Sequence, residues 1–337
     1  MTDPPTHEPL VPAYRPRKYL SVSTLISFAR CPRRYFYQKC GLQSYGIALA
    51  PTYGQAMHKA IPVALTTGDS AAAFAAFMEI WEPVEAQRKE EGYAEDDRRN
   101  PRTAMRSISH FIHTHKDDKS LYRLVAPPEG SLIPDEQTSD YEIAWVLDIN
   151  LPVPLVGRFD GLCQHRDTEE KYIWEFKTTS RLGGSFFEAH EMNIQNFAYT
   201  LAGQTATGWD IRGLMVEGML VSKTKVDNLC QPIPAQPHHL RDIITWLYRV
   251  GHDLLSVEQY AHQLMSEGRD PCDAFTKHFE ACTPYAFFYM SGFRCEYADL
   301  CNVPSWRHLT DLYTVADEHD FLSSLPDEAV PVPTVKD

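Results

Sequence analysis

Two neighbouring stretches decide the fold: LVGRFDGL, residues 155–162, and YIWEFK, residues 172–177. Each is short, rich in apolar, aromatic and β-branched residues, and typical of a β-strand. The polar segment His165–Glu170 lies between them and predicts a hairpin loop. One acidic residue in each strand, Asp160 and Glu175, is therefore brought to the same end of a predicted antiparallel pair.

A turn centred on residues 167–168 would place Asp160 directly opposite Glu175, with Cβ atoms roughly 4.5–5.5 Å apart on one face. Two like charges facing each other destabilise a sheet unless a positive group lies between them. Alternation along the strand puts Lys177 on the same face as Glu175 and points Phe176 the other way. Two carboxylates and an ammonium group suit a divalent cation, although such a trio on a half-exposed hairpin is more often only its solvated face.

Length and composition indicate a soluble globular protein. The chain has 337 residues, of which 43% are hydrophobic and 23% charged, enough for one large domain with insertions or for two domains. No apolar run approaches the ~18 residues of a membrane span. Residues 1–17 are Pro-rich and polar without the apolar segment of a secretory signal, so we expect a cytoplasmic location. We expect the N-terminus and the C-terminal tail to be disordered.

The net charge of −13 argues against a generic nucleic-acid coat protein, which would be basic. It does not exclude an enzyme that confines its basic residues to one groove. Two local basic clusters exist: Arg30, Arg33, Arg34 and Lys39, interleaved with aromatic residues, and Arg98 and Arg99 followed by Arg102 and Arg106. The chain has no G-x4-G-K-[ST] loop, so we expect no NTPase motor.

Eight cysteines in a cytoplasmic chain are more often metal ligands or buried thiols than disulfides. Cys295 and Cys301 lie close together, Cys282 lies just upstream of them, and Cys31 is far away near the N-terminus. The spacing does not fit a zinc ribbon, which requires two C-x2-C pairs. It leaves open structural thiols or an iron–sulfur cluster, which needs four thiolates with more varied spacing.

Hydrophobic periodicity predicts several helices, then β-β-β-α-β, then further helices. Ser21 or Ser23 caps the first helix, Ser70 caps the third, and Pro83 should kink or split that third helix. The predicted helices cover about residues 21–39, 53–65, 71–89, 102–116, 191–203 and 238–267; the predicted strands cover about 141–149, 155–163, 172–177 and 212–222; and 221–237 is predicted to be loop.

Five sequence elements occur in an order that resembles the PD-(D/E)XK nuclease superfamily, specifically its RecB-type and CRISPR-adaptation exonucleases that carry an iron–sulfur cluster. They are SVSTL to CPRRY (residues 21–35), Gly54-x3-His58, Gly157-Arg158-Phe159-Asp160, Glu175-Phe176-Lys177-Thr178, and Gln195-x3-Tyr199. The cysteines at the C-terminal end resemble the cluster-binding tail of those exonucleases. One position departs from the common C-x2-C-x5-C tail: Gly292 replaces its first cysteine, and Cys282 would serve instead.

The resemblance implies an α/β, restriction-endonuclease-like core, with a mixed central sheet flanked by helices, an N-terminal helical region and a C-terminal iron–sulfur segment. The expected divisions are a disordered N-terminus at 1–17, a helical region with Cys31 and His58 at 18–135, the nuclease core at 136–225, a helical and cysteine-bearing region at 226–310 and a tail at 311–337.

The resemblance also assigns roles. Asp160, Glu175 and Lys177 would be catalytic, and Mg²⁺ or Mn²⁺ would be held by His58, Asp160, Glu175 and the Phe176 carbonyl. Gln195 and Tyr199, one helical turn apart, would support the substrate. A structural [4Fe-4S] cluster would be bound by Cys31, Cys282, Cys295 and Cys301.

The expected function is a metal-dependent DNA exonuclease that acts on ends or single strands during recombination, repair, CRISPR adaptation or phage DNA processing. A helicase or recombination partner fits this interpretation, and a membrane does not. Two alternatives remain: a structure-specific endonuclease on the same fold, and a non-catalytic scaffold subunit that binds DNA ends. The intact set of Asp160, Glu175 and Lys177 argues against the scaffold.

Overall fold

A computed structural model describes residues 18–44, 49–115, 120–129 and 141–275, together with residues 295, 297, 301 and 313–315. The chain divides into two compact units. The first unit consists of Met1–Gly46, Asp148–Leu155 and Thr245–Asp337, and the second consists of Ile47–Leu147 and Val156–Ile244. The expected disorder of residues 1–17 and 326–337 lies outside the described residues.

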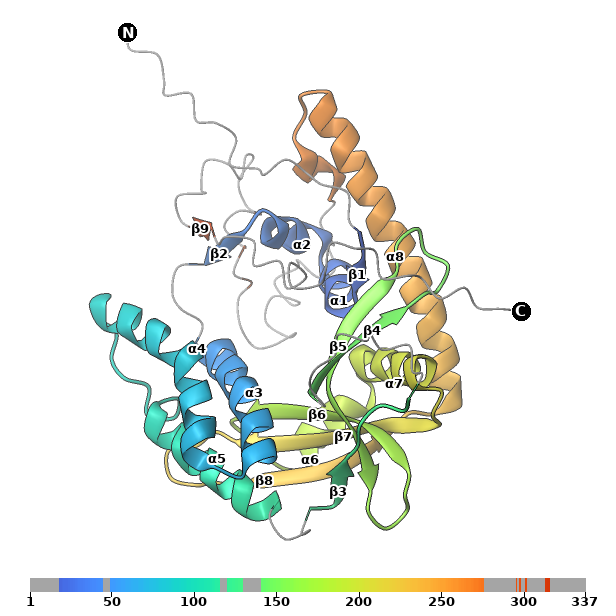
Figure 1. Cartoon of the computed structure of the whole chain (residues 1–337). Coiled ribbons are helices and arrows are strands. Elements are labelled where there is room, and N and C mark those ends of the chain that lie inside the picture. The colour runs from blue at the N-terminus through green and yellow to red at the C-terminus, as the bar shows by residue number, and fades with distance from the viewer. Residues whose placement is uncertain are drawn as a thin grey trace. The chain divides into compact units, whose positions relative to one another are not determined.

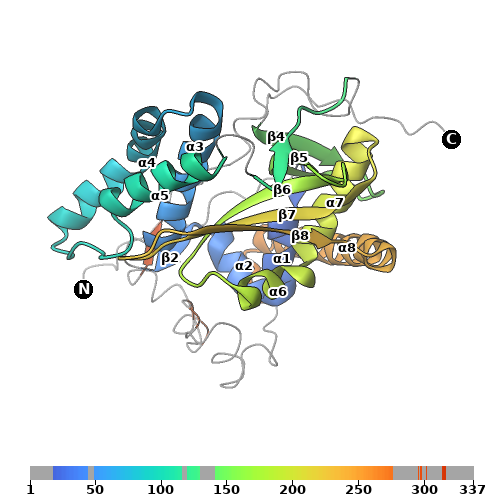
Figure 2. The ribbon, with the colours of Figure 1, turned by 90° about the horizontal axis from the view of Figure 1, so that it is seen from below.

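The second unit begins with three helices that pack on one another: α3 (Leu49–Thr67), α4 (Ser70–Glu90) and α5 (Pro101–His115). In Figures 1 and 2 they form one group beside the strands. Their contact is made mainly by small, aromatic and aliphatic side chains, which pack densely against one another. The buried residues of this contact include Ala56, Ala60, Ala73, Ala104, Tyr53, Phe77, Trp81 and Phe111.

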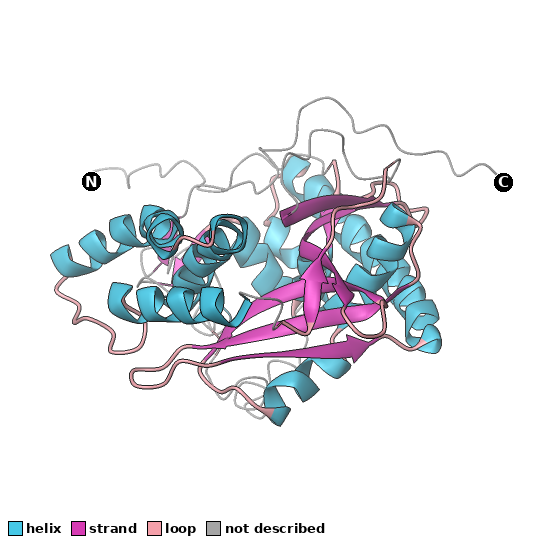
Figure 3. Ribbon diagram, turned by 60° about the horizontal axis from the view of Figure 1, so that its bottom comes forward, coloured by secondary structure: helices cyan, strands magenta, loops and turns pink. Residues whose placement is uncertain are grey.

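A mixed sheet follows (Figure 3). Its described strands have the order β1-β5-β6-β7-β8, and β3 and β4 also pair with β5. The strands are β1 (Leu20–Ser21), β3 (Tyr122–Leu124), β4 (Tyr141–Leu147), β5 (Leu155–His165), β6 (Lys171–Thr179), β7 (Ile211–Leu220) and β8 (Asn228–Pro234). β6 and β7 are parallel, whereas β5–β6 and β7–β8 are antiparallel. This arrangement confirms the predicted α/β fold class with a mixed central sheet flanked by helices.

The two faces of β6 have different partners. Trp174 and Phe176 belong to the same buried core as α3, α4 and α5. Ile173, on the other face, contacts α7 (Ile194–Thr207), where Gly203 leaves room for its side chain. Glu175 and Lys177 share that second face because side chains alternate along a strand.

Two helices connect β6 to β7, which run parallel and therefore need a crossover. They are α6 (Gly184–Glu191) and α7. Asn193 caps the start of α7 by accepting a hydrogen bond from the Gln195 amide at 2.9 Å. Gly208 ends it in the left-handed conformation, with φ of 69° and its N–H bonded to the Gln204 carbonyl.

A carboxylate is fully buried in the core of the second unit. The Glu217 side chain on β7 accepts hydrogen bonds from the Tyr122 hydroxyl, the Trp174 indole N–H (3.2 Å) and the Asn228 amide (3.0 Å). His115 at the end of α5 lies 3.2 Å from the same carboxylate. Buried charges are tolerated when they are paired and hydrogen-bonded, so this group links α5, β3, β6 and β8 around one side chain.

The first unit contains α1 (Val22–Arg30), α2 (Pro32–Lys39), the two-stranded pair of β2 (Leu42–Ser44) with β9 (Tyr313–Val315), the 3₁₀ helix η2 (Pro271–Ala274), and α8 (Pro237–Ser266) from residue 245 onward. Aromatic rings join its parts: Phe275 lies 5.0 Å from Phe36, between ring centroids, and Tyr37 lies 5.4 Å from Tyr297. Tyr35 donates a hydrogen bond to the buried Glu258 carboxylate at 2.5 Å.

Two helix predictions are corrected. The predicted helix over 21–39 is broken at Cys31, which is extended (φ −162°, ψ 107°). The cause is Pro32, which disfavours the helical conformation of the residue before it. By contrast, α4 continues through Pro83 without splitting, because its packing against α3 and α5 outweighs the ~3 kcal/mol cost of an internal proline. Its cap is Asp69, not Ser70.

The prediction missed two longer elements, β8 and α6, and also the short elements β1, β2, β3, β9 and η2. Residues 221–237, predicted to be loop, contain β8, a strand at one end of the strand order whose two prolines need not donate to a neighbour. Helix α6 was also not predicted. None of the described helices has the length and apolar character needed to cross a membrane.

The pair of His115 and Glu217 predicts a pH-dependent stability. Burial lowers the pKa of His115, but the Glu217 carboxylate outweighs burial and raises this pKa above its ordinary value of about 6.5. The folded state therefore holds the His115 proton more tightly, so the stabilisation is complete below about pH 6.5 and is lost as pH rises through the raised pKa. The substitution His115→Gln should destabilise the protein more at about pH 6 than at about pH 9.

Urea unfolding of both proteins at the two pH values measures this difference. The control is His113→Gln at an exposed position of the same helix, which should change the free energy of unfolding by less than about 0.5 kcal/mol. An equal loss for His115→Gln at both pH values would contradict the pairing.

Candidate active site

The predicted site residues of the nuclease core all lie in the second unit. Asp160 is on β5, Glu175 and Lys177 are on β6, His58 is on α3, and Gln195 and Tyr199 are on α7. The structure thus brings three separate parts of the chain to one end of the β5–β6 pair.

The strand register agrees with the pairing expected from the hairpin. Gly161 pairs with Trp174 and Leu162 with Ile173 in the antiparallel ladder of β5 and β6. Continuing the same register by one residue places Asp160 opposite Glu175. The ladder ends at Gly161, and the Asp160 carboxylate instead accepts a hydrogen bond from the Phe176 amide at 2.8 Å.

Glu175 and Lys177 form a close ion pair, with 2.5 Å between Oε1 and Nζ. Glu175 is 4% exposed, and burial together with the nearby Asp160 carboxylate raises its pKa, although Lys177 acts against this change. Burial lowers the pKa of Lys177, but the Glu175 and Asp160 carboxylates outweigh burial and raise it. Lys177 therefore carries a proton at neutral pH, whereas proximity to a metal alone would be expected to lower its pKa.

Asp160 interacts with His58, whose Nδ1 lies 3.4 Å from Oδ1. Burial raises the pKa of Asp160, but His58, Lys177 and the Phe176 amide outweigh burial and lower it. Burial likewise lowers the pKa of His58, but Asp160 raises it above the ordinary value. The pKa values of the two carboxyl groups are thus shifted in opposite directions. That of Asp160 is lowered, which keeps Asp160 ionised, whereas that of Glu175 is raised, so Glu175 depends on a neighbouring positive charge to stay ionised.

Gln195 and Tyr199 lie on the same face of α7, as their spacing predicts, and they contact each other directly. The side-chain amide of Gln195 donates a hydrogen bond through Nε2 to the Tyr199 hydroxyl at 2.8 Å. The Tyr199 ring packs against Trp145 and Phe159, with centroids 5.9 and 5.6 Å away. Burial and Glu175 raise the pKa of Tyr199, so its hydroxyl stays protonated at neutral pH.

The donor atoms suit a small, hard divalent cation. Asp160 and Glu175 supply carboxylate oxygens and His58 supplies an imidazole nitrogen, the ligand types used for Mg²⁺ and Mn²⁺. A cavity of about 10 Å³, close to the size of one water molecule, is lined by His58, Asp160 and a further carboxylate, Glu142. Within the described ranges, no three His, Cys, Asp or Glu side chains are already arranged as a complete metal site.

Two residues at the site were not identified from the sequence. Glu142, the second residue of β4, lies beside the small cavity, and its carboxylate is 3.3 Å from the Arg158 guanidinium. His190 lies at the end of α6, its Nδ1 is buried without a hydrogen-bond partner among the described residues, and burial and Lys177 lower its pKa. Neither residue belongs to a recognisable motif, and α6 itself was not predicted, so the sequence carried no usable signal for them.

The cysteines expected to bind a cluster are only partly covered by the structure. Cys31 precedes α2 and is half-buried, Cys295 is half-buried, and Cys301 is buried; all three belong to the first unit. Cys282 lies outside the described residues. Cys272, which was not predicted to bind the cluster, is hydrogen-bonded to Tyr37. Burial raises the pKa of the Cys272 thiol to about 12.

Comparison with known proteins adds a family assignment to this geometry. The model of the PD-(D/E)XK nuclease superfamily matches residues 19–302, a stretch that contains the whole β5–β6 site. Among curated proteins, the search gives no significant match.

In the Gly157-Arg158-Phe159-Asp160 motif, the glycine is required because the Trp145 side chain packs directly against its backbone. A Cβ at Gly157 would lie 2.7 Å from Trp145 Cε2 and still closer to Cζ2, and this indole contacts Tyr199 and Phe159. We therefore expect Gly157→Ala to destabilise the protein by about 1–3 kcal/mol. The loss should be smaller in a Trp145→Leu background, which removes the clash.

Chemical denaturation of the single and double variants measures this coupling. Gly184→Ala is the matched control, because a Cβ there would come within 4 Å of one described side chain, that of Glu188, at 3.7 Å. If the losses of unfolding free energy for Gly157→Ala and Trp145→Leu were strictly additive, contact with Trp145 would not be the reason for a glycine at position 157.

Proposed function

The chain belongs to the PD-(D/E)XK nuclease superfamily, and on this premise we propose that it is a Mg²⁺- or Mn²⁺-dependent DNA exonuclease of the RecB type. The observation that carries the proposal is the charged constellation at the end of β5 and β6. Glu175 is buried against Lys177, and Asp160 is held beside His58 one strand away. A protein that only bound DNA ends would gain nothing from gathering one buried carboxylate, a partly buried carboxylate and a partly buried ammonium group, since removing charge from water costs free energy.

In this proposal Asp160, Glu175, His58 and the Phe176 carbonyl hold the metal ion. When bound there, such an ion would supply positive charge beside the scissile phosphate and would lower the pKa of the attacking water. Lys177, kept protonated by the two carboxylates, donates a hydrogen bond to the phosphate and offsets the charge that develops on it. Gln195 fixes the Tyr199 hydroxyl, and this pair positions the substrate strand next to Lys177.

The proposals for a cluster and for a biological process rest on the resemblance of the sequence motifs to those of RecB-type and CRISPR-adaptation exonucleases. We assign a structural [4Fe-4S] cluster to Cys31, Cys282, Cys295 and Cys301, whose thiols have the chemistry that such a cluster requires. Recombination, repair, CRISPR adaptation and phage DNA processing are the processes in which such an exonuclease would act, on DNA ends or single strands and with a helicase or recombination protein as partner.

The central test is hydrolysis of end-labelled linear and covalently closed circular DNA with Mg²⁺ or Mn²⁺. We expect degradation of the linear DNA only, and a loss of about 100-fold or more for Asp160→Asn, Glu175→Gln and Lys177→Met, because each removes a charge that acts on the transition state. Lys171→Met is the matched control: it removes the same charge from the same strand, where Lys171 lies over the Trp209 ring.

Three outcomes would change the proposal. Cleavage of circular DNA would identify an endonuclease. Binding without cleavage of either DNA would identify a scaffold. Full activity of Lys177→Met would remove Lys177 from the chemistry.

The cluster is tested separately by metal content. Protein purified without oxygen should be brown and contain about four iron atoms per chain, bound by four thiolates. Cys31→Ser should lose the iron, whereas Cys230→Ser, which alters a thiol of the second unit, should keep it. A colourless protein with stoichiometric zinc would reject the cluster.

A further inference from the structure

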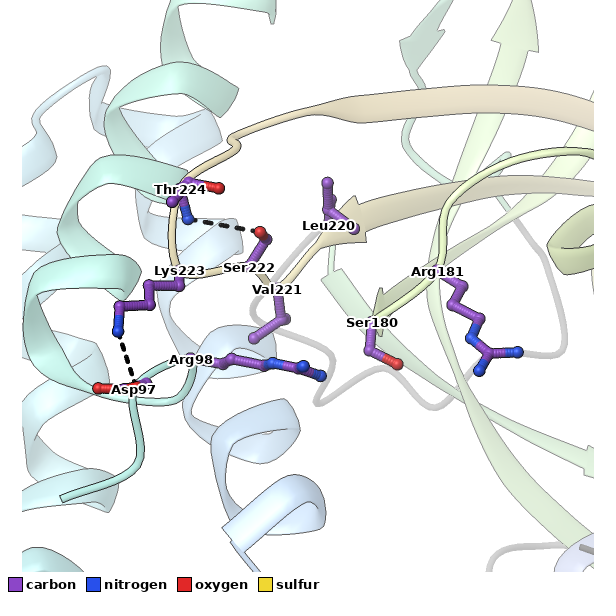
Figure 4. A pocket seen from close by; sticks show the side chains of 9 residues that line it. All are labelled: Asp97, Arg98, Ser180, Arg181, Leu220, Val221, Ser222, Lys223 and Thr224. Carbon is purple, nitrogen blue, oxygen red and sulfur yellow. Dashed lines mark hydrogen bonds and ion pairs between the residues drawn. The ribbon is translucent and has the colours of Figure 1, made fainter. Parts of the chain in front are cut away.

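A cavity of about 700 Å³ opens in the second unit near the active site (Figure 4). Three segments line it. The α4–α5 connection contributes Asp97 and Arg98, the segment after β6 contributes Ser180 and Arg181, and the end of β7 with its connection to β8 contributes residues 220–224. The proposed function leaves this cavity unused.

The cavity begins where the catalytic strand ends. Ser180 follows Lys177 by three residues, which at a rise of about 3.3 Å per residue is roughly 10 Å along the strand direction. β6 and β7 stay together up to the cavity, since the Val221 amide donates to the Thr179 carbonyl at 2.7 Å. A strand whose phosphate lies at Lys177 and which continues along β6 toward Ser180 would have its neighbouring phosphates within reach of the cavity.

The β7–β8 connection is held in place by an arginine of α5. The Arg106 guanidinium donates hydrogen bonds to the carbonyls of Ser222 and Lys223, at 3.3 and 3.0 Å. This contact fixes Lys223 against the α4–α5 connection, where its ammonium lies 2.8 Å from the Asp97 carboxylate. Both side chains of that pair are well exposed, at 64% and 73%.

The lining is basic although the chain is acidic. Arg98, Arg181 and Lys223 face a single carboxylate, Asp97, so the lining has a charge of +2 in a chain of −13. Among the described residues, neither Arg98 nor Arg181 forms an ion pair. In Figure 4 the Arg98 side chain extends across the cavity toward Ser180, while Arg181 lies beyond it.

The lining also indicates which part of a nucleic acid it would contact. Within the part of the chain that the structure describes, the lining contains three hydroxyl groups, on Ser180, Ser222 and Thr224, but no aromatic ring on which a base could stack. Cations and hydroxyl groups bind phosphate oxygens without regard to sequence. These features fit the sugar–phosphate backbone of a nucleic-acid strand rather than its bases.

We propose that this cavity binds the phosphodiester backbone of the substrate strand beside the scissile bond, with Arg98 and Arg181 as its main phosphate contacts. Lys223 is a weaker contact because Asp97 neutralises it. The inference rests on the proposed nuclease function for the identity of the strand, but the binding itself is measured without cleavage.

The test uses the full chain with Asp160→Asn, so that DNA is not consumed, and fluorescence polarisation of a labelled single-stranded oligonucleotide. Arg98→Gln with Arg181→Gln should weaken binding by about tenfold or more. It should also reduce the slope of log affinity against log salt by about 0.7 per lost contact. Asp97→Asn, which frees Lys223, should tighten binding and steepen that slope.

Arg212→Gln is the matched control, because Arg212 lies at the other end of β7 in exposed ion pairs with Glu170 and Asp210. It should leave affinity unchanged, and thermal melting checks that every variant is folded. Unchanged binding after loss of both arginines, weaker binding of Asp97→Asn, or no DNA binding at all would overturn the proposal.

A small substrate separates this inference from the nuclease function. In the otherwise wild-type chain, hydrolysis of bis(p-nitrophenyl) phosphate, which has a single phosphate, should be unaffected by Arg98→Gln and Arg181→Gln, whereas degradation of long DNA should fall. If the predicted binding pattern is found but the wild type hydrolyses neither substrate, the nuclease function fails and the cavity assignment stands. A loss of small-substrate hydrolysis equal to the loss on DNA would show that the arginines act at the scissile phosphate itself.

Discussion

The site depends on one electrostatic constraint: two carboxylates, the buried Glu175 and the partly buried Asp160, lie near each other on neighbouring strands. Each would be unstable there alone, because burial disfavours a charged group and like charges repel. His58 offsets Asp160 and Lys177 offsets Glu175. The balance is uneven, since the pKa of Asp160 falls while that of Glu175 rises. Lys177 neutralises only part of the negative charge of the two carboxylates, and a divalent cation between them would neutralise the rest.

The fold holds this unfavourable pair through the alternation of β6. Trp174 and Phe176 anchor the strand in the helical core, and this packing fixes the direction of Glu175 and Lys177 on the opposite face. A second buried carboxylate, Glu217, ties β7 to α5 and β3 beside the same strand. The apolar core and the hydrogen-bond network of Glu217 therefore meet along β6. The positions of the site residues are fixed by this packing, which lies outside the site itself.

Local chemistry made part of this architecture predictable. The composition of the two β-strands and of the loop between them determined the hairpin, and the observed pairing of Gly161 with Trp174 has the expected register. The effect of Pro32 depends only on its neighbour Cys31, whereas the tolerance of Pro83 depends on tertiary packing that no local pattern records. For the same reason β8, α6, His190 and Glu142 were not found: each has its role through partners distant in the sequence.

The cation-binding role of the two carboxylates is tested most directly by titration of the protein with Mn²⁺, followed by the electron paramagnetic resonance signal of the free ion. The account predicts saturable binding by the wild type, accompanied by a rise in melting temperature, since an ion that binds only the folded state stabilises it. Glu175→Gln, which keeps the shape and removes the charge, should lose both effects. Equal Mn²⁺ affinity of wild type and Glu175→Gln would contradict the account.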